Sequence, residues 1–411
     1  MLQGKSKIAI IGAGFVGAAI AYNVAINRTA SEIVLIDVNN DKAMGEALDI
    51  NHGLCHLGQM NIHAGDYSDC ANCDAIVMTA GLNRKPGETR LDLANKNVPV
   101  AKSITENIMK YYNHGVIIVV ANPADVLTYL IQKWSGLPAN LVFGTGTALD
   151  SARFRFYLAQ KLNVDIQNIH GYIIGEHGDS QVPVWSATSV AGQSVDVYCK
   201  SLGIPLTEAD KLDIVTKTKN GGAEVIRLKG ATYFAIAGIV ENVIEAVIKD
   251  KNSIKTVASV LDGAYGIHDV ALSLPSVINQ KGVDGIERQV HEQAPQRRSV
   301  ALHPWHLVGQ QQVGLDPLRV DLVGQRGHFL QDPLHEHRLA PLARVLAGCR
   351  KLVGKDIEVT DIDVVARQHP LDFVHLPLGQ ADRQHFADRH RHEQQVFKAV
   401  PHRGREIPGG G

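Results

Sequence analysis

Short, unbroken apolar runs alternate with longer amphipathic stretches along the first 145 residues. Buried parallel strands are apolar on both faces, so the runs predict strands at Lys7–Ile11, 32–38, 73–81, 115–123 and 141–147. Between them, apolar residues recur at helical spacing and predict helices at 18–27, 44–54, 93–112 and 124–136. Strands that alternate with helices in this way predict a doubly wound α/β domain over residues 1–145.

The pattern changes from Leu149 onward. A helix is predicted over 149–163, followed by a strand and loop over 169–192. A long helical stretch with glycine breaks covers 210–250, and hairpin-forming strands cover 256–283. These elements predict a second, α+β domain over residues 146–287.

The composition changes near residue 287. Up to Glu287 the chain has 18 Lys, 6 Arg and 7 His, whereas from Arg288 on it has 3 Lys, 14 Arg and 12 His in less than half the length. The later segment shows no sustained helical or strand period. It is either an appended domain or a frame-shifted or misassembled sequence fused to a truncated domain. In sequences that fold, local propensity, apolar pattern and turn residues agree with one another, and this segment lacks that agreement. This favours the second interpretation and predicts a poorly ordered segment over 288–411.

Charge and apolar content exclude several functional classes. The formal net charge is -1, so no global basic field favours nucleic acid or a membrane surface. No apolar run approaches the ~20 residues of a membrane helix, and the N-terminal residues do not resemble a signal peptide. The five cysteines are scattered and fit reduced thiols. We therefore expect a cytoplasmic protein.

A glycine motif stands where the first strand meets the first helix. Gly12, Gly14 and Gly17 form G-x-G-x-x-G, in which the first two glycines permit a tight turn close to a pyrophosphate and the third permits close helix–strand packing. Asp37 follows the second strand, at the distance expected for a carboxylate that binds a ribose 2′-hydroxyl and repels a 2′-phosphate. The combination predicts a Rossmann domain that binds NAD rather than NADP.

A second cluster carries acid–base chemistry. His177 lies between glycines in "GEHGD", directly after a predicted strand, where it could donate and accept a proton near neutral pH. Asp150 and Arg153 lie three residues apart on one helix face. A carboxylate could orient the imidazole, and an arginine could bind a substrate carboxylate with two hydrogen bonds. Alone, the histidine could equally be structural and the pair an exposed salt bridge.

The motifs "GAGFVG", "AGLNRKPGETRLDL", "VVANPADVLTY", "LDSARFR", "HGYIIGEHGD", "KGATYFAIA" and "YGIHDVALSLPSVI" occur in one order along the chain. On these motifs residues 5–287 resemble the lactate/malate dehydrogenase family, and within it the bacterial L-lactate dehydrogenases. The resemblance implies an NAD-dependent oxidoreductase that interconverts a 2-oxo acid and an L-2-hydroxy acid, such as pyruvate and L-lactate. Residues 288–411 do not share it.

The resemblance also implies roles for individual residues. His177 would exchange a proton with the substrate carbonyl, Asp150 would orient it, and Arg90 would polarise the carbonyl. The substrate-binding residues would be Arg153, Asn122, Thr232 and Arg84. The cofactor-binding residues would be Gly12, Gly14, Val16, Gly17, Asp37, Ala80, Gly81, Asn122 and Ile236.

Arg84 departs from the lactate pattern. The family position before "KPGETR" is usually Gln in lactate enzymes, and Arg is typical of malate enzymes, where it pairs with the second carboxylate of oxaloacetate. Around the same pocket, "GETRLDL" and "KGATY" are of the lactate type. The sequence thus favours lactate and leaves malate, or another 2-hydroxy acid, as alternatives.

Arg155 and His170 match the pair that binds fructose 1,6-bisphosphate in allosteric members of the family. The resemblance places that site between subunits and implies a homotetramer. Plain surface charge is the alternative interpretation of these two residues.

A metal site is not expected. Cys70 and Cys73 form C-x-x-C without a second ligand pair.

Beyond residue 287 the chain lacks the final amphipathic helix typical of the family. A folded NAD-binding protein without activity, and a binding function for residues 288–411, are therefore alternatives to a working enzyme.

Overall fold

The computed structural model describes residues 6–82, 87 and 89–286. Nine strands form one mixed sheet in the order β14-β13-β12-β6-β5-β4-β1-β2-β3. Six of them are parallel, namely β1 (Lys7–Ile11), β2 (Glu32–Ile36), β3 (Asn61–Ala64), β4 (Ala75–Met78), β5 (Val116–Val119) and β6 (Val142–Gly144). The predicted doubly wound sheet is confirmed.

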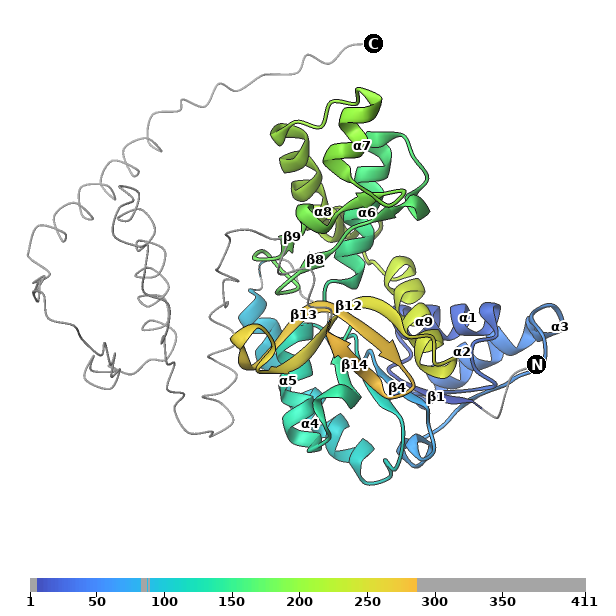
Figure 1. Cartoon of the computed structure of the whole chain (residues 1–411). Helices are drawn as coiled ribbons and strands as arrows, with labels where there is room; N and C mark the ends of the chain where they lie inside the picture. Colours follow the sequence, from blue (N-terminus) through green and yellow to red (C-terminus); the bar gives the residue numbers. More distant parts are fainter. Residues whose placement is uncertain (1–5, 83–86, 88, 287–411) are drawn as a thin grey trace, which may run out of the picture. The chain divides into compact units, whose positions relative to one another are not determined.

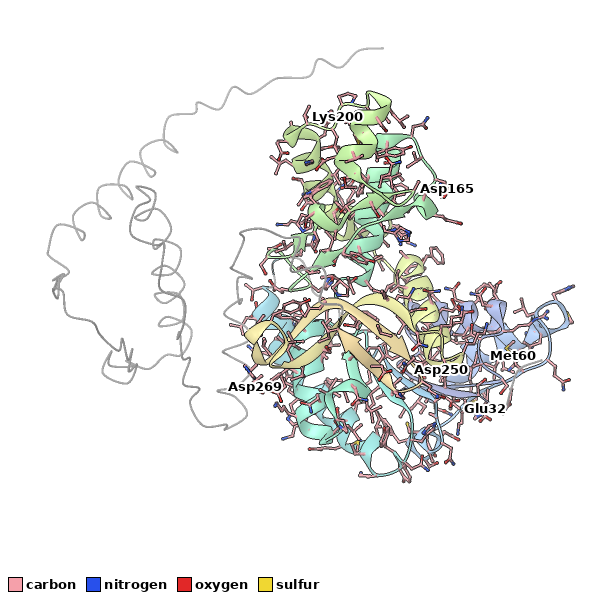
Figure 2. All side chains as sticks on the ribbon, viewed as in Figure 1. Glu32, Met60, Asp165, Lys200, Asp250 and Asp269 are labelled. Carbon is pink, nitrogen blue, oxygen red and sulfur yellow. The ribbon has the colours of Figure 1, made fainter. Side chains whose placement is uncertain are left out.

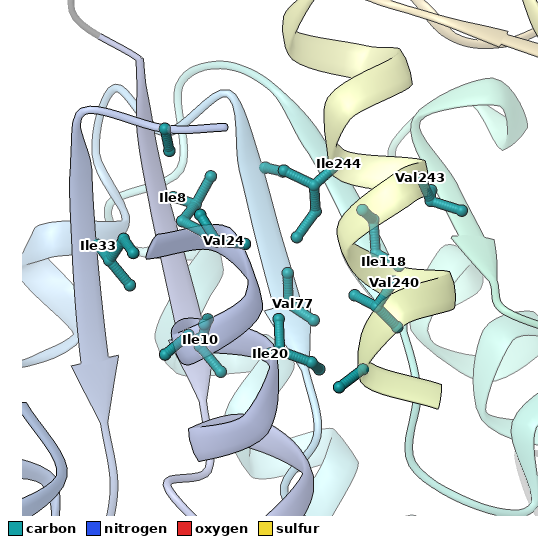
Figure 3. Packing of buried hydrophobic residues seen from close by; sticks show 14 of the residues in the cluster. Ile8, Ile10, Ile20, Val24, Ile33, Val77, Ile118, Val240, Val243 and Ile244 are labelled. Carbon is teal, nitrogen blue, oxygen red and sulfur yellow. The ribbon is translucent and has the colours of Figure 1, made fainter. Parts of the chain in front are cut away.

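Helices cover both faces of the parallel strands (Figure 1). On one face α1 (Phe15–Asn27), α2 (Asn40–His52) and α9 (Phe234–Ile248) pack in a single apolar cluster. On the other face lie α4 (Arg90–Met109) and α5 (Ala124–Ser135). Figure 3 shows Ile20 and Val24 of α1 meeting Val240 and Ile244 of α9 over the strands. The helix that follows the glycine turn is thus anchored by a helix more than 200 residues later in the chain.

A second group of elements carries the predicted histidine and its neighbours. It contains α6 (Ala148–Leu162), α7 (Val195–Leu202), α8 (Glu208–Lys229) and the short strands β7 (Ile169–His170), β8 (Ile173–Ile174), β9 (Val182–Pro183), β10 (Ser189–Val190) and β11 (Gln193–Ser194). Asp165 and Lys200 mark this part in Figure 2. Its own apolar core joins α6 to α7 and α8 through Phe154, Leu158, Cys199 and Ile214.

The predicted hairpin is confirmed, and it also extends the main sheet. The strands β12 (Ser253–Asp262), β13 (His268–Asn279) and β14 (Gly282–Ile286) run antiparallel, and β12 pairs with β6. The sequence pattern did not reveal this pairing, nor did it predict β3, which is only four residues long. The boundary predicted at residue 145 falls between β6 and α6 and stays a prediction.

Only one of the glycine breaks predicted in the 210–250 stretch occurs where expected. Gly230 ends α8 with a φ of 84°, but Gly221 and Gly222 lie inside that helix. A β-carbon at either position would come within 3.2–3.3 Å of Arg153. These two glycines therefore let the Arg153 side chain lie directly against the helix, and they do not interrupt it.

Two predictions fall outside the described residues. The interpretation of 288–411 as a poorly ordered segment is one, and the role of Arg84 is the other. Arg90 begins α4 after the Thr89 cap, but its side chain is also outside the description.

Candidate active site

The glycine turn has the geometry that close approach of a ligand requires. Gly12 has a φ of 103°, and a β-carbon there would lie 2.8 Å from the Ala80 backbone nitrogen. At Gly17 a β-carbon would lie 1.9 Å from the Gly12 carbonyl oxygen, so only glycine fits between helix and strand. Gly14 is at the N-cap of α1, and apart from its chain neighbours no described residue has an atom within 4 Å of the β-carbon position there. The turn is therefore closed on the protein side and open where a pyrophosphate would lie against the helix N-terminus.

Asp37 is built into the same turn. It follows β2, and its Oδ2 accepts a hydrogen bond from the Ala13 nitrogen at 2.7 Å. Its Oδ1 accepts one from the Asn39 nitrogen at 2.9 Å. A carboxylate offers about four acceptor positions, so Asp37 can fix the turn and still accept a ribose hydroxyl. This arrangement fits the adenosine half of NAD.

Four more of the predicted cofactor residues lie after β4 and on the helices α1 and α9. Ala80 and Gly81 follow β4, and the Ala80 nitrogen donates to the Ile11 carbonyl at 2.8 Å. Val16 of α1 and Ile236 of α9 pack against the same apolar cluster from the two neighbouring helices. The roles of these residues toward NAD stay predictions.

The predicted acid–base residues meet around one buried carboxylate. Asp150, in the first turn of α6, places Oδ2 at 2.6 Å from His177 Nδ1 and Oδ1 at 3.0 Å from Arg153 Nη1. The exposed fraction of the Asp150 side chain is 4%, and that of Arg153 is 17%. The pair is therefore not the exposed helix salt bridge that the sequence left possible. Asp150 holds the imidazole and the guanidinium in fixed positions at once.

The Asp150 carboxylate stabilises both neighbouring cations and is stabilised by them. Burial by itself would raise the pKa of Asp150, but His177 and Arg153 hold that pKa below its usual value. Burial would lower the pKa of His177, and the Asp150 carboxylate overcomes this effect, so the pKa of His177 is raised. With Nδ1 bonded to a carboxylate, the ring is oriented to exchange a proton through Nε2. The side chain remains 27% exposed.

Two residues of this region escaped sequence reasoning. Asp125, near the start of α5, accepts a hydrogen bond from the His177 backbone nitrogen at 2.8 Å. Asn97 of α4 is 2% exposed and donates to the Asn122 carbonyl at 2.7 Å and to the Leu82 carbonyl at 3.1 Å. It joins the loop after β4 to the loop after β5. An acidic residue in a first helical turn and an Asn in an amphipathic helix both have ordinary structural explanations, so neither gave a signal.

Asn122 and Thr232 occupy the connections predicted for them. Asn122 follows β5 in an exposed position, and its Oδ1 accepts a hydrogen bond from the Ala124 nitrogen at 3.3 Å. Thr232 is half-buried in the link between α8 and α9. Their roles in substrate binding stay predictions.

The predicted effector pair lies on neighbouring elements. Arg155, on α6, donates from Nη2 to the Ile166 carbonyl at 3.2 Å, and its buried Nε has no hydrogen-bond partner among the described residues. Burial lowers the pKa of Arg155. Lys255 of β12 has a lowered pKa, first from burial and then from the nearby Arg155 charge. His170 is exposed in β7. The cationic side chains of Arg155 and Lys255 therefore approach each other here.

The described residues contain neither a metal-binding cluster at the cysteines nor a membrane-spanning helix. Cys70 and Cys73 are buried, and burial raises the pKa of each thiol to about 12. Across 6–82, 87 and 89–286, no three His, Cys, Asp or Glu side chains are grouped to hold a metal ion. Within the same part of the chain, none of the helices is both long and apolar enough to cross a membrane.

A dinucleotide turn after β1, together with a His–Asp–Arg cluster formed by α6 and the loop after β8, defines a class of NAD-dependent dehydrogenases. The chain belongs to the lactate/malate dehydrogenase family: residues 6–144 match the family's NAD binding domain and 147–297 its alpha/beta C-terminal domain. The second match extends ten residues beyond the composition change at 287.

L-lactate dehydrogenases are among the curated relatives of this chain. That of Thermoanaerobacterium saccharolyticum is 47% identical over 278 residues, which cover 68% of this chain and 89% of the relative. That of Clostridium acetobutylicum is 45% identical, covering 69% and 91%. Among solved structures, the L-lactate dehydrogenase from Clostridium thermocellum has a TM-score of 0.61 at 55% identity, covering 69% of this chain and 90% of its own. The minor L-lactate dehydrogenase from Enterococcus mundtii has a TM-score of 0.68 at 38% identity, covering 77% and 99%.

Proposed function

We propose that this chain is an NAD-dependent L-lactate dehydrogenase, which reduces pyruvate to L-lactate and catalyses the reverse reaction. The observation that carries the proposal is the pair of short contacts from Asp150 to His177 and to Arg153. One buried carboxylate thus positions a proton donor and a cation for a substrate carboxylate. The names of the relatives support pyruvate over oxaloacetate as substrate.

Each residue of the cluster has a distinct task in this scheme. NAD, when bound, supplies or accepts the hydride. Protonated His177 gives its proton to the carbonyl oxygen as pyruvate is reduced, and neutral His177 takes it back when lactate is oxidised. Asp150 stabilises the imidazolium, and Arg153 binds the substrate carboxylate through two parallel hydrogen bonds.

The remaining roles rest on the family resemblance. Arg90 polarises the substrate carbonyl, and Asn122 donates a hydrogen bond to the substrate oxygen or the nicotinamide ribose. Thr232 lies beside the variable group of the substrate. Arg84 is the residue that would favour a dicarboxylate, so its substitution is the sharpest probe of substrate choice.

His177→Asn tests the assignment of the proton donor. The variant should lose about 10²–10⁴-fold in kcat/KM for pyruvate, because Asn cannot deliver a proton. NADH binding, followed by the fluorescence of the bound cofactor, should stay within about twofold of the wild type, since His177 lies outside the glycine turn. Pyruvate reduction at the wild-type rate would refute the assignment.

We also propose that fructose 1,6-bisphosphate activates the enzyme through Arg155 and His170, in a cytoplasmic homotetramer. The buried Arg155 Nε, which has no hydrogen-bond partner among the described residues, and the lowered pKa of Lys255 support a site for an anion. An anion there would relieve the repulsion between Arg155 and Lys255. The effector should lower KM for pyruvate in the wild type and not in Arg155→Gln. An equal response in both would remove Arg155 from the site, and a single-subunit mass in solution would contradict the tetramer.

A further inference from the structure

Asp125 places a second carboxylate against the residue proposed as the proton donor. It lies in the first turn of α5 and is 5% exposed. Its Oδ2 accepts the hydrogen bond from the His177 backbone nitrogen at 2.8 Å. Its Oδ1 is fully buried and has no hydrogen-bond partner among the described residues. The side chain therefore uses one oxygen to fix the loop and leaves the other without a bond.

A loop anchor alone does not require a charge at this position. The amide oxygen of an asparagine would accept the same N–H bond, and burying an amide costs less than burying a carboxylate. This cost disfavours the charged form, and burial accordingly raises the pKa of Asp125 to about 7. Stabilisation by the N-terminus of α5 is the plain structural explanation for an acid in this turn. The position of Asp125 beside His177 provides a second explanation for an acid here.

His177 lies between charges that come from two helices. From α6, Asp150 contacts its Nδ1 at 2.6 Å and favours the imidazolium, while the Arg153 cation opposes it. From α5, the Asp125 charge favours the imidazolium. Glu176, in the same loop as His177, is buried, accepts a hydrogen bond from Ser180, and repels the charge of Asp125.

We propose that Asp125 is a positioning residue that holds the His177 backbone and stabilises the protonated imidazole during turnover. This inference rests on the proposed function, in which His177 delivers the proton. The two carboxylates then have different tasks. Asp150 orients the ring through Nδ1, whereas Asp125 holds the loop and adds negative charge from α5.

The pH dependence of pyruvate reduction follows from this arrangement. Reduction requires protonated His177, so its rate falls as pH rises through the raised pKa of that residue. Removing the Asp125 charge lowers the pKa of His177 and moves this fall to lower pH. A nearby charge changes a pKa by about 1, so kcat/KM at pH 8.5 should drop by up to about tenfold. The difference should shrink below pH 7, where Asp125 itself takes up a proton.

The test is a profile of kcat/KM for pyruvate from pH 6 to 9.5, at saturating NADH, on the full chain. Asp125→Asn removes the charge and keeps an acceptor for the His177 N–H. Asp125→Ser also removes the charge and, being smaller, serves if the amide fails to fold. Asp262→Asn is the matched control, because its carboxylate is 94% exposed. NADH binding and the thermal transition check that each variant is folded.

The expected result is a descending limb displaced to lower pH in Asp125→Asn and Asp125→Ser, with Asp262→Asn unchanged. A uniform loss of activity with an unmoved limb would overturn the proposal and leave Asp125 as a structural anchor. Wild-type behaviour in both Asp125 variants would also overturn it. Failure of the proposed function is distinguishable, since His177→Asn would then retain pyruvate reduction whatever the Asp125 variants do.

Discussion

Replacing Asp150 with asparagine should disable the chemistry and leave the cofactor site intact. The carboxylate contacts His177 at 2.6 Å and Arg153 at 3.0 Å, and only 4% of its side chain is exposed. Losing an opposite charge at this range lowers a histidine pKa by about 1–3. At a pH above both the original and the lowered pKa, the imidazolium fraction of His177 is then about 10–1000-fold smaller than in the wild type. Arg153 loses its partner in the same step, so kcat/KM for pyruvate should fall about 10²–10⁴-fold in total.

The assay is the initial rate of NADH oxidation at pH 7.5 over a range of pyruvate concentrations. Asp213→Asn is the matched control, because it breaks an exposed Asp–Lys pair of 2.6 Å on α8, and such pairs contribute about 0–1 kcal/mol. That variant should behave as the wild type. If Asp150→Asn kept its rate within fivefold of the wild type, the pair of contacts would not carry the reaction.

Four further substitutions test the cofactor and substrate sites. Gly17→Ala should destabilise the protein by about 1–3 kcal/mol in thermal unfolding, because its β-carbon meets the Gly12 carbonyl, whereas Gly14→Ala should leave unfolding unchanged and weaken NADH binding. Equal stability of the two variants would contradict the turn geometry. Asp37→Ser should reduce the preference for NADH over NADPH by on the order of tenfold, measured as the ratio of dissociation constants, and an unchanged ratio would remove Asp37 from the ribose site. Arg84→Gln should lower any oxaloacetate reduction by on the order of 100-fold while pyruvate reduction is kept; unchanged oxaloacetate turnover would show that Arg84 does not select the substrate.

Much of the cofactor site could be predicted because its constraints are local. A glycine with positive φ and a helix packed against a strand require glycine at fixed spacing, and Asp37 follows at the end of the next strand. Asp150 and Arg153 are also local, since they are one helical turn apart. Linking them to His177 needed the family motifs, because that contact spans 27 residues.

What the sequence left hidden depends on packing between distant segments. Asn97 and Asp125 have ordinary explanations within their own helices, and their contacts appear only when α4 and α5 meet the loops after β5 and β8. The pairing of β12 with β6 joins segments over 100 residues apart, which no local period encodes. The glycine pair Gly221–Gly222 has no local explanation within α8, because its neighbour Arg153 comes from another helix.

The most direct measurement is NADH oxidation by the full chain with pyruvate and, separately, with oxaloacetate. The proposed function predicts turnover on pyruvate, with a kcat/KM well above that for oxaloacetate. Turnover on oxaloacetate in preference to pyruvate would contradict the lactate assignment. NADH binding without turnover on either acid would contradict enzymatic function itself.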